Sequence, residues 1–122
     1  MKKLKTMDEL HKIREEMSKM TEKEKSELIN MLKRFKRQNN IEKIYLFGSQ
    51  ATGKIHKWSD VDLIVVSKSF RGKGLLDRVP ELYMKWNLDY PVDFLCYTPE
   101  EFNKLKKQIT IVRDAVNEGI EI

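Results

Sequence analysis

Three aspartates interrupt the apolar stretches of this sequence and are the residues best suited to metal chemistry. Asp60 and Asp62 lie just before the apolar run 63–66, and Asp93 lies inside the apolar segment 91–97. Side chains two residues apart on a strand project from the same face, so the Asp60 and Asp62 carboxylates should stand side by side, with Cα atoms about 6 to 7 Å apart. Like charges at that spacing repel by roughly 2.5 kcal/mol at an effective dielectric near 20, and a hard divalent cation offsets this repulsion. The pair predicts a metal site. The alternative interpretation is that Asp60 lies in a turn and Asp62 faces water.

Asp93 is the candidate for a third metal ligand. Burial of an unpaired carboxylate is costly, so its side chain should face the sheet surface or a ligand. If its strand neighbours the strand of Asp62, the three carboxylates can hold two Mg²⁺ ions roughly 3.5 to 4 Å apart, an arrangement suited to in-line displacement at phosphorus. Nucleotide phosphates would then supply the remaining oxygen ligands.

A phosphate-binding turn is predicted upstream of the aspartates. Gly48 and Ser49 follow an apolar segment that ends at Phe47. Glycine lets a backbone approach a phosphate closely, and the serine hydroxyl and the next amides can donate to the same oxygens. Gly-Ser is common in simple turns, so the pair carries weight only together with the aspartates. His56 and Trp58, between the two motifs, are expected to be exposed and packed, respectively, rather than to bind a ligand.

Two capping boxes predict two helices at the N-terminus. Thr6 is followed three residues later by Glu9, and Thr21 is followed in the same way by Glu24. In this motif the two side chains satisfy free backbone donors at the start of a helix. Both segments continue with apolar residues at three-and-four spacing, which predicts one apolar face on each helix.

The remaining elements are marked by β-rich segments and by further caps. Strands are expected at 42–47, 61–66 and 91–97. Helical spacing covers 75–88, where Pro80 should lie in the first turn or kink the helix. A final helix should begin after the cap Thr98, with Pro99 at its first position, and end at Gly119. Its apolar stripe is Phe102, Leu105, Ile109, Val112 and Val116.

This order of elements predicts an α/β (α+β) fold with a three- or four-stranded mixed sheet flanked by helices. The chain of 122 residues has the size of one domain. We divide it into an N-terminal helical extension (1–40), a core that carries the motifs (41–97) and a C-terminal helix (98–122).

Composition predicts a cytoplasmic protein. The longest apolar run is four residues, far short of the roughly 20 that a membrane-spanning helix needs. The single cysteine, Cys96, excludes an internal disulfide and is expected in the core. Residues 1–40 contain twelve Lys or Arg and seven Asp or Glu, whereas residues 41–122 contain twelve of each. This basic excess can attract nucleic acid or an acidic partner, but a solvated helix surface is the simpler interpretation.

Gly48-Ser49, ten intervening residues and then Asp60-Val61-Asp62-Leu63 resemble the signature of the DNA polymerase β-like nucleotidyltransferase superfamily. Asp93 is similar to the third acidic position of that superfamily. The small size and the helix that begins at Thr98 resemble the stand-alone minimal nucleotidyltransferases encoded beside HEPN-domain toxins. In that family the protein acts as an antitoxin and can transfer AMP onto a tyrosine of the toxin.

The resemblance implies a role for each matching residue. It implies nucleotide-binding residues at Gly48, Ser49 and Lys54, where Lys54 or Lys57 replaces an arginine that many relatives carry after Gly-Ser. It implies catalytic and metal-binding residues at Asp60, Asp62 and Asp93. Of these, Asp60 and Asp62 would hold both ions, and Asp93 would ligate the catalytic ion and help to deprotonate the acceptor hydroxyl.

The function implied is metal-dependent transfer of a nucleoside monophosphate, AMP from ATP, to a HEPN toxin, with two Mg²⁺ ions or Mn²⁺ in their place. One alternative is an antitoxin that neutralises its partner by contact without chemistry. A nucleic-acid binder that uses the basic N-terminal helices is the least favoured alternative. Those helices can also form a docking surface for the acceptor or a homodimer contact.

Overall fold

The computed structural model describes residues 21–47 and 61–122. In these two segments the helices are α2 (Glu22–Gln38), the 3₁₀ turn η2 (Lys68–Phe70), α3 (Leu75–Lys85), α4 (Pro99–Leu105) and α5 (Ile111–Glu118). The strands are β1 (Lys43–Phe47), β2 (Val61–Val66), β3 (Val92–Tyr97) and β4 (Ile120–Glu121). The expected strands are confirmed to within one residue. The capping box at Thr6 and the first predicted helix lie outside the described residues.

The four strands form one mixed sheet in the order β3-β2-β1-β4. β1 pairs antiparallel with both β2 and β4, whereas β2 and β3 run parallel. The two central strands, β1 and β2, are mostly buried because helices cover both faces of the sheet. The predicted α+β class and the mixed sheet are therefore confirmed, with four strands.

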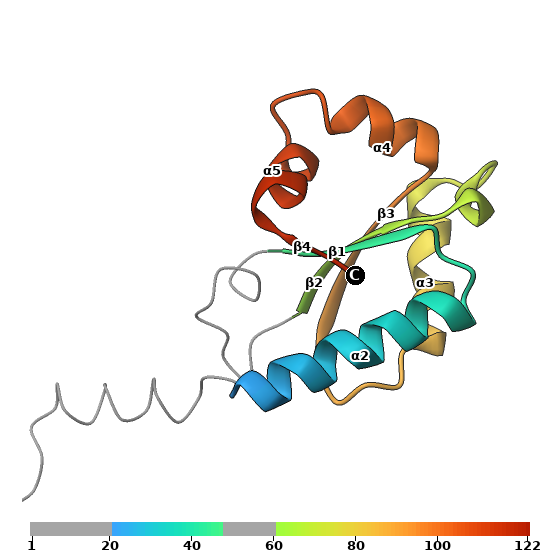
Figure 1. Cartoon of the computed structure of the whole chain (residues 1–122). Coiled ribbons are helices and arrows are strands. Elements are labelled where there is room, and N and C mark those ends of the chain that lie inside the picture. The colour runs from blue at the N-terminus through green and yellow to red at the C-terminus, as the bar shows by residue number, and fades with distance from the viewer. Residues whose placement is uncertain (1–20, 48–60) are drawn as a thin grey trace, which may run out of the picture.

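Each face of the sheet has its own core (Figure 1). Below the sheet, α2 and α3 pack against alternate strand residues. Members of this core include Leu28, Leu32, Phe35, Ile44, Leu46, Val61, Leu63, Val65, Leu82, Val92, Phe94 and Cys96. Above the sheet, α4 and α5 pack against the residues in between, among them Tyr45, Ile64, Val66, Phe102, Val112 and Ala115. The period of two along the strands thus assigns each strand side chain to one face.

Helix α2 is fixed at both ends by local hydrogen bonds. The predicted capping box is present, because Thr21 Oγ1 accepts from the Glu24 N–H at 3.1 Å and the Glu24 carboxylate accepts from Thr21 in return. At the other end Asn40 has a positive φ of 50°, and the Ile41 N–H donates to the Lys36 carbonyl at 3.0 Å. The Asn40 N–H donates to the carbonyl of Arg37, the residue after Lys36. Together these two hydrogen bonds form a Schellman motif.

The prediction of one C-terminal helix from 98 to 119 is wrong, because the chain turns between α4 and α5. Thr98 and Glu101 form the expected capping box, and Pro99 is the first helical residue. The turn follows because Thr110 Oγ1 donates to the Leu105 carbonyl at 2.8 Å and caps α5 by accepting from a backbone N–H. β-Branched residues at 109–112 also weaken a continuous helix. Ile109, which was assigned to the apolar stripe, is 94% exposed in this turn.

Helix α3 is shorter than expected, and Pro80 takes the second of its two expected positions. Pro80 lies inside the helix rather than in its first turn, and the helix ends at Lys85 instead of residue 88. A proline in a helix interior removes one backbone hydrogen bond, at a cost of about 3 kcal/mol, so packing must stabilise α3. The side chain of Arg78 contributes, since it donates to the carbonyls of Lys73 at 2.9 Å and Cys96 at 3.1 Å.

Gly119 ends α5 as predicted, but for a different reason than a left-handed backbone. Its φ is −82°, which any residue adopts. A Cβ at this position would overlap the carbonyl oxygen of Ala115 and would lie 2.7 Å from that of Leu46. Glycine is therefore required for the close approach that allows β4 to pair with β1.

Candidate active site

Asp62 and Asp93 lie directly beside each other on the parallel strands β2 and β3. Neighbouring strands are about 4.8 Å apart, so the two Cα atoms are close enough for both carboxylates to contact one ion. The flanking residues Val61, Leu63 and Val92 belong to the core below the sheet. Because side chains alternate, both aspartates project from the opposite face, where Asp62 is half-buried and Asp93 is exposed.

The C-terminal end of β1 lies at the same end of the strands as Asp62. Phe47, the last residue of β1, pairs with Asp62 in the antiparallel register. The predicted phosphate-binding residues follow Phe47 directly in the sequence, and the third predicted carboxylate precedes Val61. Gly48, Ser49, Lys54 and Asp60 themselves lie outside the described residues. Of the six predicted site residues the structure therefore places two, Asp62 and Asp93, and it brings them together.

Two aromatic side chains of the α3 region hold the start of β3, the strand that carries Asp93. The Tyr83 hydroxyl donates to the Val92 carbonyl at 2.8 Å, and Trp86 Nε1 donates to the Tyr90 carbonyl at 2.8 Å. Both rings also pack edge to face on Phe94. These contacts fix the backbone before Asp93 and the Phe94 side chain after it.

The sequence does not predict this positioning. The rings of Tyr83 and Trp86 serve in packing, whereas their polar atoms hold the backbone at the start of β3. The available signal was the residue type, because a tyrosine or tryptophan whose ring packs on the core often finds a hydrogen-bond partner for its O–H or N–H. The partner itself, a backbone carbonyl, has no signature in the sequence.

The donor set at this edge is suited to a hard divalent cation. Carboxylate oxygens are the ligands that Mg²⁺ prefers, and it is usually held by one or two of them together with substrate phosphates. Asp62 and Asp93 fit that requirement. In the part of the chain that the structure describes, no group of three His, Cys, Asp or Glu side chains could hold a metal ion, and the third predicted carboxylate, Asp60, lies outside that part.

Cys96, on the same strand as Asp93, is unsuited to nucleophilic chemistry. Its side chain is 4% exposed, and burial raises the pKa of the thiol to about 12, although the nearby Arg78 guanidinium opposes this shift. A thiol with that pKa is protonated at neutral pH and is a poor nucleophile. The prediction of a core cysteine is confirmed.

The model of the nucleotidyltransferase domain family matches residues 28–118. This range includes β1, β2 and β3 and most of α2, but not β4. The chain belongs to this family. The resemblance to the minimal nucleotidyltransferases is thereby confirmed, and membership implies an NTP substrate and transfer of a nucleoside monophosphate. Nucleotidyltransferases generally use divalent metals, which agrees with the carboxylate pair on β2 and β3.

A sequence relative agrees with this assignment. The chain is 29% identical over 80 residues to the probable protein adenylyltransferase MntA of Haemophilus influenzae, and the match covers 64% of this chain and 70% of the relative. This similarity supports the conclusion that the chain is a transferase enzyme. The adenylyl group and the protein acceptor in that name belong to the relative.

A solved structure supports the fold. The chain resembles the crystal structure of a nucleotidyltransferase candidate from Sulfolobus solfataricus with a TM-score of 0.56, over 80% of each chain. The two sequences are 19% identical, so the likeness concerns the fold alone.

Proposed function

We propose that this nucleotidyltransferase transfers AMP from ATP to a hydroxyl group of a protein acceptor. The observation that carries the proposal is the direct pairing of Asp62 with Asp93 on one face of the sheet, at the edge where β1 ends. The similarity to a protein adenylyltransferase favours AMP and a protein over other nucleotides and acceptors.

The aspartates would hold two divalent cations, Mg²⁺ or Mn²⁺. Asp60 and Asp62 would ligate both ions, and Asp93 would ligate the catalytic ion. When bound, such ions lower the pKa of the acceptor hydroxyl and neutralise charge on the phosphates. Gly48, Ser49 and Lys54 would bind the β- and γ-phosphates.

The reaction forms one bond at phosphorus and breaks one. The acceptor oxygen attacks the α-phosphorus, the bond from that phosphorus to the oxygen bridging the α- and β-phosphates breaks, and pyrophosphate leaves with that bonding pair. Asp93, the more exposed of the two described carboxylates, would accept the proton of the acceptor hydroxyl. Its position on an exposed edge of the sheet lets a second protein approach the site.

The acceptor that we propose is a HEPN-domain toxin, with the chain as its antitoxin in the cytoplasm. This part of the proposal is based on the resemblance of the motif region to minimal nucleotidyltransferases encoded beside such toxins. The tested consequence is covalent: the partner should gain one or more AMP groups on tyrosine.

The experiment is transfer of radioactivity from α-³²P-labelled ATP, GTP, CTP and UTP, with Mg²⁺ or Mn²⁺, to a co-purified partner protein. The Asp60→Ala/Asp62→Ala variant tests the metal site, and Asp89→Ala is a matched control, since Asp89 is an exposed aspartate in the loop before β3. Label should appear on the partner with ATP, in the native protein and in the Asp89 control, and should be absent with the double variant.

Two results would contradict the proposal. A verified partner that binds but stays unlabelled with every NTP and both metals would leave neutralisation by contact as the account. Equal labelling by the double variant would show that the aspartates do not carry the reaction.

A further inference from the structure

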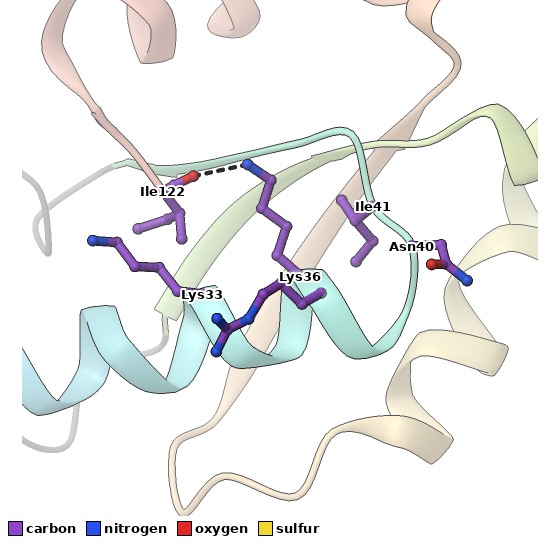
Figure 2. Close-up of a pocket in the computed structure, with 6 residues that line it drawn as sticks. Lys33, Lys36, Asn40, Ile41 and Ile122 are labelled. Atoms are coloured by element: carbon purple, nitrogen blue, oxygen red, sulfur yellow. Dashed lines mark hydrogen bonds between the residues drawn. The ribbon is translucent and has the colours of Figure 1, made fainter.

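A second, basic pocket lies between the end of α2 and the C-terminal segment (Figure 2). Its volume is about 510 Å³, and it is lined by Lys33, Lys36, Arg37, Asn40, Ile41 and Ile122. The walls therefore carry three cations and no carboxylate side chain, and Ile41 and Ile122 form its apolar part. The size is within the range of small-molecule sites.

The pocket is separate from the aspartate site. Helix α2 packs on the sheet face that contains Val61 and Leu63, whereas Asp62 and Asp93 project from the other face. Ile122 follows β4, which is the opposite edge strand from β3.

The framework of the pocket is held by backbone hydrogen bonds. The Schellman motif satisfies the Lys36 and Arg37 carbonyls with backbone N–H groups, and the Asn39 N–H and side-chain amide both donate to the Phe35 carbonyl. The basic side chains are therefore not needed to cap these carbonyls, which is a common role for cations in the last turn of a helix.

Two of the three cations in the pocket, Lys33 and Arg37, are not neutralised by an ion pair within the described part of the chain. Residues 28–41 contain four cations and no Asp or Glu. Among the described residues, Lys33 and Arg37 form no ion pair. They lie four residues apart on α2, and repulsion between like charges at this spacing destabilises a helix. Lys36 Nζ donates to the main-chain oxygen of Ile122 at 3.0 Å (Figure 2), which leaves two of its three N–H donors for another acceptor.

We propose that this pocket binds a small polyphosphate anion, such as pyrophosphate or the phosphate groups of a nucleotide. Phosphate oxygens match the planar donor fork of Arg37 and the ammonium groups of Lys33 and Lys36. The apolar floor can contact a nucleoside. The site is independent of the proposed transfer reaction and does not require a metal.

The arrangement favours a compact anion over a nucleic acid. The three cations lie within five residues of α2 (33–37), about 6 Å along its axis, whereas a nucleic-acid strand needs a longer basic track. The first turns of α2 carry glutamates at 22, 24 and 27, which interrupt such a track.

The test is calorimetric titration of the full chain with pyrophosphate in the presence of EDTA, which removes metal-dependent binding at the aspartates. The Lys33→Ala/Arg37→Ala variant removes the two cations without an ion pair. Lys23→Ala/Arg113→Ala is the matched control, because it removes one lysine and one arginine that are exposed elsewhere. Circular dichroism checks that each variant is folded.

We expect the native protein, the control and an Asp62→Asn/Asp93→Asn variant to bind pyrophosphate equally. The pocket variant should bind at least tenfold more weakly, since each charged hydrogen bond contributes about 1.5 to 3 kcal/mol, which converts to at least tenfold in affinity. Absence of binding to the native protein, or equal weakening by the control, would overturn the proposal. So would loss of binding in the aspartate variant, or a single-stranded RNA that displaces pyrophosphate with a steep salt dependence, which would indicate a nucleic-acid surface.

Discussion

Replacement of Arg78 by methionine should lower the free energy of unfolding by about 2 to 3 kcal/mol. Arg78 is 7% exposed, and its guanidinium donates to Glu101 at 2.7 Å as well as to the carbonyls of Lys73 and Cys96. Methionine fills a similar volume but cannot donate to any of these three acceptors, although the Thr98 N–H still donates to Glu101 at 2.9 Å.

The magnitude follows from the environment of each acceptor. Loss of one partner of a buried ion pair costs about 3 to 5 kcal/mol. The Glu101 side chain is 39% exposed, so water can solvate it after the substitution, and the cost falls below that range, to about 2 to 3 kcal/mol. At about 2.1 cal/mol/K per residue, unfolding of 122 residues has an entropy near 256 cal/mol/K, and 2.5 kcal/mol corresponds to a Tm lower by about 10 °C.

The effect should also depend on pH. Burial by itself raises the pKa of the Glu101 carboxyl, but hydrogen bonds from the Thr98 N–H and Arg78 hold the pKa below its ordinary value. A carboxyl with a lowered pKa in the folded state stabilises the protein above its unfolded pKa, about 4.3, and this contribution is lost as the pH falls through the folded pKa. The difference between the native protein and the variant should therefore narrow below about pH 4, although the bonds to the two carbonyls do not titrate.

Urea unfolding followed by circular dichroism at neutral and acidic pH measures both effects. Arg113→Met is the control, because Arg113 is exposed on α5. A loss no larger than that of the control at neutral pH would refute the assigned role of Arg78. A difference that stays constant with pH would refute the contribution of Glu101.

Three further predictions concern other positions. Gly119→Ala should cost about 2 kcal/mol or more by urea unfolding, because its Cβ would lie 2.7 Å from a backbone oxygen of β1; a neutral effect would show that this close approach is not required. Tyr83→Phe removes the 2.8 Å bond to the Val92 carbonyl, and it should cost about 1 kcal/mol and raise the metal concentration needed for half-maximal transfer; unchanged metal dependence would mean that Tyr83 does not position Asp93. The buried Cys96 thiol, with its pKa raised to about 12, should resist iodoacetamide at pH 8 in the native protein and react once unfolded in guanidinium chloride; rapid native labelling would contradict its burial.

The sequence predicted features that depend on residues close together in the chain, such as strand alternation and helix caps. The strand at 61–66 was predicted from its β-rich residues, and the period of two along it places Asp62 on the face opposite Val61 and Leu63. The capping boxes at Thr21 and Thr98 marked the starts of α2 and α4 because both partners lie within one turn.

Features that depend on distant or competing contacts were not predicted. Ile109 has the right spacing for an apolar helix stripe, but the cap and back-bond of Thr110 favour a turn. Arg78 has its partner Glu101 23 residues away, on another helix, so nothing in its local sequence distinguishes it from a surface arginine. Asp62 can lie beside Asp93 only if their strands are neighbours, and the sequence does not determine the strand order.

Binding of Mn²⁺ is the most direct test of the central claim, that Asp62 and Asp93 hold one divalent ion between them. Electron paramagnetic resonance can count free and bound Mn²⁺ in the presence of α,β-methylene-ATP, which does not react. Asp62→Asn and Asp93→Asn should each weaken Mn²⁺ binding by roughly tenfold or more, because each removes a charged oxygen ligand, whereas Asp89→Asn should bind like the native protein. Native affinity in either site variant would contradict the claim.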